Sequence, residues 1–548
     1  MIWRKRVAIG LTNINFEAFI SITGINNFNN SAMNKLMHWL PSKKKSFFIK
    51  FSFIFIGIAS TIWFLVRVIP KPQRAAYPCM RVAAPIMSGF VIWLLSLSGA
   101  IASFRKAKLN FKSSNYFYSV ILLVLAVICT LVFIGGGTEN AYAKSPAEWV
   151  IIPNQPLGIA KGIFPGRVAW VHDPQVATWD GKNGNWWDEN VVSQLEADKM
   201  LKESLLSLTG EKTENKAWIA LFKSFNSKRT GKDISYQQGQ KIAVKINTNN
   251  TYSHKNSEEI NATPQLVLSL LKSLVKEAAI AQENITVFDA SRFITDNIFI
   301  KCHAVFPGVI FVDNVGGDGR IKSEYVDNLI PYSKDNGKLA TGLAKCAVDA
   351  DYLINMALLK GHVGQGVTLC AKNYYGVTSI YNDWRKNAHN NFNPDREGKP
   401  QYLTFVDFLA HKELGNKTML FLIDGIYGSK LVNGVPSPKW QMAPFNNNWA
   451  CSLLASQDPV AIDAVGLDFL RSEWPDAPDM AFSDQYLIEA ALADNPPSGT
   501  KYDPQRNGAV INSLGVMEHW NNVTEKKYSR NLGRKEGIEL VQTSILSK

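Results

Sequence analysis

Hydrophobic positions divide the chain into two parts with different patterns. Near the N-terminus, residues 51–69, 82–102 and 116–136 are almost wholly apolar; the first carries one arginine and the other two carry no charge. Each is about as long as the roughly 20 residues that a membrane-spanning helix needs. This pattern predicts a three-span transmembrane anchor, with buried helices of a soluble protein as the alternative.

The second part contains a strand–helix–strand pattern. Residues 241–247 (KIAVKIN) form a short β-branched run. Thr263-Pro264 then offers a cap residue and a proline for the first helical position, followed by leucine and valine at helical spacing. Residues 284–292 (NITVFDASR) form a second strand that ends at Asp289. The pattern predicts a parallel crossover.

Further strands and a helix extend this pattern. Strands are predicted over 309–314, 351–357 and 418–425, and a helix over 458–474, with Asp458 as its cap and Pro459 as its first residue. The predicted fold class is therefore α/β, a mainly parallel sheet with flanking helices, preceded by three transmembrane helices.

The expected organisation has four parts. They are a cytoplasmic N-terminal segment, the anchor, a linker rich in Gly, Pro and Asn, and an exterior α/β domain, over residues 1–50, 51–136, 137–165 and 166–548. The core of the exterior domain is expected over 240–470. Because the first 32 residues show little periodicity, we expect the true start at Met33 or Met37.

Charge is distributed unevenly. Residues 1–149 carry 17 Lys and Arg against 3 Asp and Glu, and the rest of the chain carries 42 against 43. The basic balance therefore belongs to the N-terminal part and gives no argument for nucleic-acid binding. Basic clusters at 43–50 and 105–112 should stay in the cytoplasm. This predicts a multi-pass protein of the cytoplasmic membrane, with the lipid bilayer as a partner and a large extracytoplasmic C-terminal domain.

The six cysteines include no C-x-x-C pair, so neither a cysteine zinc site nor an iron–sulfur cluster is supported. Four lie in the second part and are interpreted as buried free thiols, although export would permit disulfides. They are Cys302, Cys346, Cys370 and Cys451.

Polar side chains stand where four predicted strands end. In open parallel sheets, ligands bind in the crevice outside the carboxyl ends of the strands. The strand ends carry Asn247 and Asn249, then Asp289 with Ser291 and Arg292, then Lys360 with His362, and Asp424. Their convergence on one edge predicts a site.

The stretch 352–379 (YLINMALLKGHVGQGVTLCAKNYYGVTS) is interpreted as an anion-binding loop. Its glycines let backbone N–H groups approach a ligand, and Lys360 and Lys372 supply positive charge. If a helix begins within VTLCAKNYYG, Thr368 and Lys372 would share one face of it, next to Asn373. The alternative is a glycine-rich connection with solvated lysines.

Other candidates have structural alternatives. Asp289 could hydrogen-bond a sugar hydroxyl or cap a helix, and Asp424 could be a turn residue. With His362 these two carboxylates could hold a divalent metal, but no close ligand pairing supports that, so no metal site is predicted. A cluster of tryptophans would suit carbohydrate stacking, although packing is the commoner role of tryptophan. Its members are Trp170, Trp179, Trp186 and Trp187.

Two catalytic or cofactor-binding motifs, G-x-S-x-G and G-x-G-x-x-G, are missing after a strand. Their absence disfavours serine hydrolases and Rossmann oxidoreductases.

Residues 240–470 resemble the bacterial and archaeal family called domain of unknown function 362. The matching segments, in the order of that family, are KIAVKINTNN, TPQLVLSLLKSLVKEA, ITVFDASR, LINMALLKGHVGQGVTLCAKNYYG, FLIDGIYG and SQDPVAIDAVGLDFL. The resemblance implies that ten residues matter: Lys245, Asn247, Asp289, Arg292, Lys360, His362, Thr368, Lys372, Asn373 and Asp424.

The family is uncharacterised, many of its members are exported, and many carry ferredoxin-like [4Fe–4S] motifs that imply redox work. This chain lacks those cysteines, so the cluster does not transfer and the cofactor stays open. We expect an enzyme-like site for an unknown small ligand, anionic or polyhydroxylated. His362, Asp289 and Lys372 are the catalytic candidates, with His362 as the proton-transfer group, and the other seven residues bind the ligand. The alternative is a non-catalytic binding or assembly module of an envelope system.

Overall fold

The computed structural model describes most of the chain beyond residue 77. The described residues are 61, 78–113, 115–135, 152–363, 366–379, 403–477, 480 and 483–545. They fall into two compact units, with unit 1 ending at Lys144 and unit 2 beginning at Ser145.

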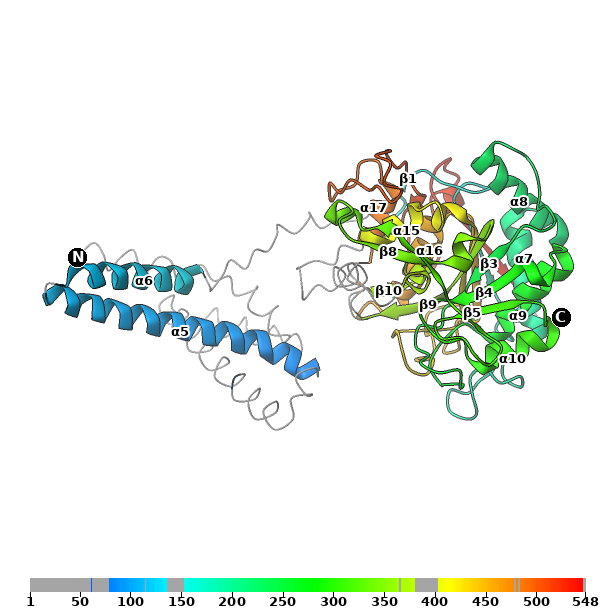
Figure 1. Cartoon of the computed structure of the whole chain (residues 1–548). Coiled ribbons are helices and arrows are strands. Elements are labelled where there is room, and N and C mark those ends of the chain that lie inside the picture. Colours follow the sequence, from blue (N-terminus) through cyan, green and yellow to red (C-terminus); the bar gives the residue numbers. More distant parts are fainter. Residues whose placement is uncertain are drawn as a thin grey trace. The chain divides into compact units, whose positions relative to one another are not determined.

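Unit 1 contains two helices that pack against each other, α5 (Pro78–Lys112) and α6 (Tyr116–Gly135) (Figure 1). The Ser119 hydroxyl donates to the Ala107 carbonyl at 2.9 Å and so joins them. Two expected spans, 82–102 and 116–136, fall on these helices, whereas 51–69 lies outside the described residues except for Thr61. Among the described residues, no helix has the length and apolar character that crossing a membrane requires, so the three expected transmembrane helices are not supported.

A twisted sheet forms the centre of unit 2 (Figure 1). From β11 through β9, β3, β4 and β5 to β6 the neighbouring strands are parallel, while β12 runs antiparallel to β11 and β2, and the short β10 pairs with β9. The prediction of a mainly parallel sheet is confirmed. In spatial order the strands are β14 (Glu539–Ser544), β2 (Arg167–His172), β12 (Ser452–Ser456), β11 (Thr418–Ser429), β9 (Tyr352–His362), β3 (Ile242–Lys245), β4 (Ile285–Asp289), β5 (Ile310–Asp313) and β6 (Ile321–Lys322), with β10 (Gly366–Thr368) beside β9.

Helices cover both faces of this sheet and enclose two hydrophobic cores. Side chains along β3 point alternately to the two cores: Ala243 faces one core, and Ile242 and Val244 face the other. One face is covered by α7 (Gln194–Thr209), α8 (Glu214–Thr230), α9 (Pro264–Lys272) and α10 (Asp296–Val305); the other by α12 (Cys370–Asn373), α15 (Leu403–Ala410), α16 (Pro459–Glu473) and α17 (Gln485–Ala491).

Short elements complete unit 2. A pair of two-stranded sheets lies outside the main one, and the last turns of α9 continue as a π-helix. β1, which lies in the segment that was expected to be a linker, pairs with β13 near the other end of unit 2. The bounds are β1 (Leu157–Gly158), β13 (Val516–Met517), β7 (Tyr325–Pro331), β8 (Ala340–Ala344), α11 (Lys345–Val348) and the π-helix Ser273–Glu277.

Several predicted boundaries agree with the structure. Strand β4 ends at Asp289, Pro264 opens α9, and the Asp458 side chain caps α16 by accepting from the N–H groups of Val460 and Ala461. The candidate carbohydrate-stacking tryptophans are buried, with exposed fractions of 8% or less. Their burial supports the packing interpretation, because a buried ring offers no open face to a sugar.

The cysteines of unit 2 carry free thiols in the described structure. Cys302, Cys370 and Cys451 are buried, and Cys346 is half-buried. Burial raises the pKa of the Cys302 thiol to about 12, so that thiol is protonated at neutral pH. The interpretation as buried free thiols therefore holds for three of the four.

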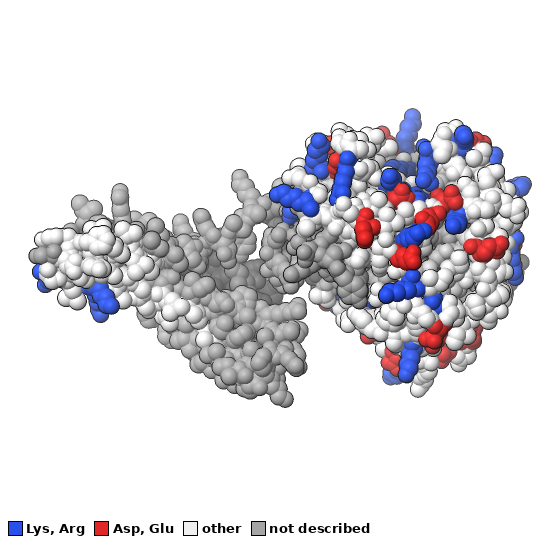
Figure 2. Space-filling view, in the orientation of Figure 1, with Lys and Arg blue, Asp and Glu red and all other residues white. Residues whose placement is uncertain are grey.

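The surface of unit 2 carries both signs of charge. On the face shown in Figure 2, Lys and Arg are interspersed with Asp and Glu. This agrees with the balanced count of 42 basic and 43 acidic residues after residue 149.

Candidate functional site

Strand order explains why distant residues meet. From β3 the chain builds β4 and β5 towards one edge of the sheet, and later adds β9 on the other side of β3, followed by β11. The neighbours β9 and β3 therefore form a topological switch point, where open α/β sheets bind ligands outside the carboxyl ends of their strands. The predicted polar side chains follow these ends.

A cavity of about 290 Å³ lies at this position. It is lined mainly by polar and charged side chains from the ends of β3 and β4, from the region of β9, β10 and α12, and from a loop after β11. The lining residues are Lys245, Asn247, Asn249, Asn250, Tyr252, Asp289, Ser291, Arg292, His362, Thr368, Lys372, Asn373, Tyr375, Gly376, Val432 and Asn433.

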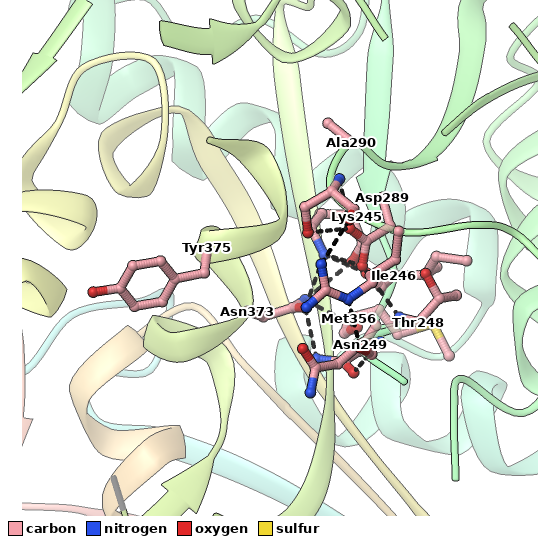
Figure 3. A network of polar contacts seen from close by, with 12 residues as sticks. Lys245, Ile246, Thr248, Asn249, Asp289, Ala290, Met356, Asn373 and Tyr375 are labelled. Carbon is pink, nitrogen blue, oxygen red and sulfur yellow. Dashed lines mark hydrogen bonds and ion pairs between the residues drawn. The ribbon is translucent and has the colours of Figure 1, made fainter. Parts of the chain in front are cut away.

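Lys245 is the centre of a buried polar network at the cavity wall (Figure 3). Its Nζ lies 3.1 Å from Asp289 Oδ2 and 3.0 Å from Asn373 Oδ1, and it also donates to the carbonyl of Ile246. The exposed fractions of Lys245 and Asp289 are only 1% and 2%. A buried charge needs such a full set of partners to be tolerated.

Asn373 links this network to the sheet. Its Nδ2 donates to Asn355 Oδ1 at 2.8 Å and to the Met356 carbonyl at 3.2 Å, both on β9. Its Oδ1 also accepts from Asn247 Nδ2 at 3.1 Å. Since these bonds occupy the amide on both sides, Asn373 joins β3 to β9, whereas the sequence interpretation assigned it to the ligand.

Asp289 is held as a carboxylate. Burial raises its pKa, but Lys245, the Thr248 N–H and Arg292 outweigh burial, and the pKa falls below its ordinary value. Its Oδ1 accepts from the backbone N–H of Ser291 at 3.1 Å and from the hydroxyl of Ser291 at 3.2 Å. The one carboxylate among the described lining residues is therefore compensated locally.

Gly376 allows the chain to approach this ion pair closely. A Cβ atom at this position would lie 2.4 Å from Lys245 Nζ and 2.7 Å from Asp289 Oδ1. Its carbonyl also accepts from the Ala290 N–H at 2.8 Å. No side chain fits here without displacing the pair.

Two cations of the cavity lie beside aromatic rings. The Arg292 guanidinium is 5.3 Å from the centre of the Tyr252 ring, and Lys372 Nζ is 5.0 Å from that of Tyr375. Such cation–π contacts orient a positive group without neutralising it. Among the described lining residues, Lys245, Arg292 and Lys372 are cationic and Asp289 alone is acidic.

Asp463 of α16 holds the segment around Lys372 in place through hydrogen bonds to its backbone. Its carboxylate accepts from the N–H groups of Cys370 and Ala371 at 2.8 and 3.0 Å and thereby caps the short helix α12. The expectation that Thr368 and Lys372 share a helical face was wrong: Thr368 belongs to β10, and α12 begins only at Cys370. The first N–H groups of α12 serve Asp463.

Two predicted ligand-binding residues lie outside the cavity lining. Lys360 is fully buried and its Nζ donates to the Ile260 carbonyl at 3.3 Å, while Asp424 accepts from the N–H groups of Thr263 and Ile426 at 2.8 and 3.1 Å. Both therefore hold the backbone near the start of α9. Burial lowers the pKa of Lys360 to about 7.

Sequence reasoning missed much of the mouth of the cavity. Tyr252 is 75% exposed beside Arg292, and the Asn250 side chain donates to the Val432 carbonyl at 2.6 Å, which ties two distant loops together. A run of asparagines after a strand was the available signal for the first loop. Nothing in the sequence marks Val432 and Asn433, because their place depends on how the loop after β11 folds back.

His362 lies at the rim, at the end of β9. Its Nδ1 lies 2.6 Å from the carbonyl of Val363. A neutral imidazole that donates from Nδ1 carries its basic lone pair on Nε2, the atom that would exchange a proton. The position among the lining residues is compatible with the role predicted for His362.

In the part of the chain that the structure describes, no group of three His, Cys, Asp or Glu side chains is placed to hold a metal ion. The three-residue metal set considered from the sequence is not assembled, because Asp424 is turned towards the start of α9. Asp289 and His362 do line the same cavity.

Comparison with known proteins finds a family match over the segment that forms the cavity. No curated protein and no solved structure matches the chain. One family model does match, over residues 242–468, which run from β3 into α16 and contain every described residue that lines the cavity. The cavity-forming segment of this chain thus matches the family described as Domain of unknown function (DUF362).

Proposed function

We propose that unit 2 binds a small anionic ligand in the cavity at the carboxyl ends of β3, β4 and β9. The observation that carries this proposal is the imbalance of charge in the lining. Among the described residues, the lining contains the cations Lys245, Arg292 and Lys372 but a single carboxylate, Asp289, which is already paired with Lys245. Three cations against one carboxylate give the described lining a positive field, which attracts an anion.

The dimensions of the cavity restrict the ligand to a small molecule. A volume of about 290 Å³ is at the lower end of the roughly 300–1,000 Å³ typical of ligand pockets. The lining is also rich in amides and hydroxyls, which recognise polar ligands by direct hydrogen bonds.

His362 is the proposed proton-transfer group. An imidazole titrates near neutral pH and can therefore serve as acid or base under physiological conditions. Asp289 is a weaker candidate for that role, since Lys245, Thr248 and Ser291 engage its carboxylate. The proposal thus assigns charge recognition to Arg292 and Lys372 and proton transfer to His362.

Binding of a simple anion tests this proposal. Titration calorimetry of the full chain with inorganic phosphate should detect binding in low salt, and raising the sodium chloride concentration from about 50 to 500 mM should weaken it, because salt screens charges and chloride competes. A neutral sugar serves as the control. Salt-independent binding of phosphate, or none at any concentration up to about 10 mM, would contradict the proposal.

We also propose that unit 1 attaches the chain to the cytoplasmic membrane, with unit 2 outside the cytoplasm. Large apolar side chains are exposed on both helices, including Leu95, Phe104 and Phe117 at 65%, 58% and 72%. Neither α5 nor α6 contains an acidic residue, and basic residues lie at 105–112 near the turn between them. Apolar surface flanked by basic groups favours a bilayer with anionic lipids.

Cell fractionation tests the membrane proposal. The full chain should remain in the membrane pellet after an alkaline carbonate wash, and protease added to intact spheroplasts should digest unit 2. Release of the chain by carbonate, or protection of unit 2 until the cells are lysed, would overturn the proposal.

A further inference from the structure

Some polar atoms of the cavity have no protein partner, and they indicate what a ligand must offer. The clearest is Thr368 Oγ1. The residue is only 2% exposed, it lines the cavity, and its hydroxyl makes no hydrogen bond among the described residues. A buried hydroxyl without a partner costs about 1–3 kcal/mol, so such groups are usually satisfied by something.

Asn249 provides a second open atom of a different kind. Its side-chain Nδ2 donates to Asn250 Oδ1 at 3.2 Å, and its backbone carbonyl oxygen accepts from Arg292 Nε at 2.6 Å. Within the described residues, its side-chain Oδ1 has no donor. An amide oxygen only accepts, so this half-buried atom can receive a hydrogen bond from a ligand that donates one.

Arg292 makes the opposite demand. Its Nε and Nη1 donate to the carbonyls of Asn249 and Ser291 at 2.6 and 2.8 Å, which fixes the guanidinium in the cavity wall. Its Nη2 donates to no described residue. This nitrogen only donates and carries positive charge, so it can bind an acceptor of a ligand, best an anionic oxygen.

We propose that the ligand carries a hydroxyl group and an anionic group in one molecule, as a sugar phosphate or a sugar acid does. The anionic group is bound by Arg292 and Lys372, and a hydroxyl bonds to Thr368 and Asn249. This inference rests on the proposed anion-binding function and adds the second requirement to it. A simple anion offers little to Asn249 Oδ1, which can only accept, and a neutral sugar offers no charge to Arg292.

Replacing Thr368 with valine tests the second requirement. Valine has nearly the shape of threonine, and the lost hydroxyl has no partner among the described residues, so unit 2 should unfold in urea at the same concentration as the wild type or a higher one. Calorimetry of the full chain with glucose 6-phosphate and with glucuronate should show one of the two bound at least about 10-fold more tightly than inorganic phosphate and than glucose. T368V should lose about 5- to 10-fold of that affinity, and its affinity for phosphate should not change.

Thr248 offers a matched control. Its hydroxyl is also buried and without a partner among the described residues, yet Thr248 does not line the cavity. T248V should therefore leave the affinity for all four probes within about twofold of the wild type. Thr368→Ser, which keeps the hydroxyl, should retain most of the affinity for the hydroxylated acid.

The outcomes separate the two proposals. If phosphate binds but neither hydroxylated acid binds more tightly, or if T368V and T248V behave alike, the inference about the hydroxyl fails and the anion site stands. If none of the charged probes binds, both proposals fail. If glucuronate binds more tightly than glucose 6-phosphate, the anionic group is a carboxylate, and the reverse order identifies a phosphate; either order supports the inference.

Discussion

Replacing Lys245 with methionine is expected to lower the free energy of unfolding of unit 2 by about 3–5 kcal/mol. The change removes the positive partner of Asp289 and leaves a buried carboxylate without compensation. Methionine fills a similar volume, so a cavity contributes little to the loss. Urea unfolding of the full chain, followed by circular dichroism, measures the effect.

A double variant separates charge from packing. Lys245→Met combined with Asp289→Asn removes both charges and should recover a large part of the lost stability, which a double-mutant cycle quantifies. The opposite finding, a double variant less stable than either single one, would mean that the pair matters through its hydrogen bonds more than through its charge.

The pH dependence of this loss follows from the lowered pKa of Asp289. A carboxyl whose folded-state pKa is depressed adds stability above its unfolded value, near 3.9, and this stability is lost as the pH falls through the folded-state pKa. The difference between the wild type and Lys245→Met should therefore be largest near neutral pH and shrink towards pH 3.

Lys372→Met is expected to lower the affinity for an anionic ligand roughly 10- to 100-fold, since hydrogen bonds to charged groups contribute about 1.5–3 kcal/mol. Lys372 lines the cavity and is 7% exposed beside Tyr375. Its removal leaves the Lys245–Asp289 pair intact. Calorimetric titration with inorganic phosphate checks the affinity, and circular dichroism checks the fold.

Lys526 is the matched control for this variant. It is 8% exposed, and its Nζ lies 5.7 Å from the centre of the Trp520 ring, but it does not line the cavity. Lys526→Met should leave phosphate affinity unchanged. Equal losses in the two variants would show that the loss reflects the net charge of the protein, and would remove Lys372 from the proposed site.

The strands that position this site could be predicted from the sequence. Strands β3, β4 and β9 are recognisable as short apolar runs, and polar residues follow each of them directly, so the rule for parallel sheets places Asn247, Asp289 and His362 together. The structure confirms that convergence.

Side-chain direction could not be predicted. Lys360 and Asp424 follow the same sequence rule as Asp289, yet their side chains turn to the backbone of the loop before α9. Which polar group reaches the cavity and which supports its wall depends on packing between elements far apart in the chain. The same holds for Thr368, whose place in β10 depends on the turn after β9.

One residue of the lining has a different role from the one predicted. Asn373 was expected to bind the ligand, but its amide is engaged by Lys245, Asn247 and Asn355. Sequence alone does not reveal that an amide is already satisfied, because its partners lie on other strands.

The wide separation of the cavity residues along the chain, from Lys245 to Asn433, has a practical consequence for finding the natural ligand. A binding site of this kind exists only while the whole domain is folded, so any compound that occupies it raises the melting temperature. At a concentration 100 times its dissociation constant, a ligand adds about 2.7 kcal/mol. Thermal-shift screening of a metabolite library can therefore identify the natural ligand without an activity assay.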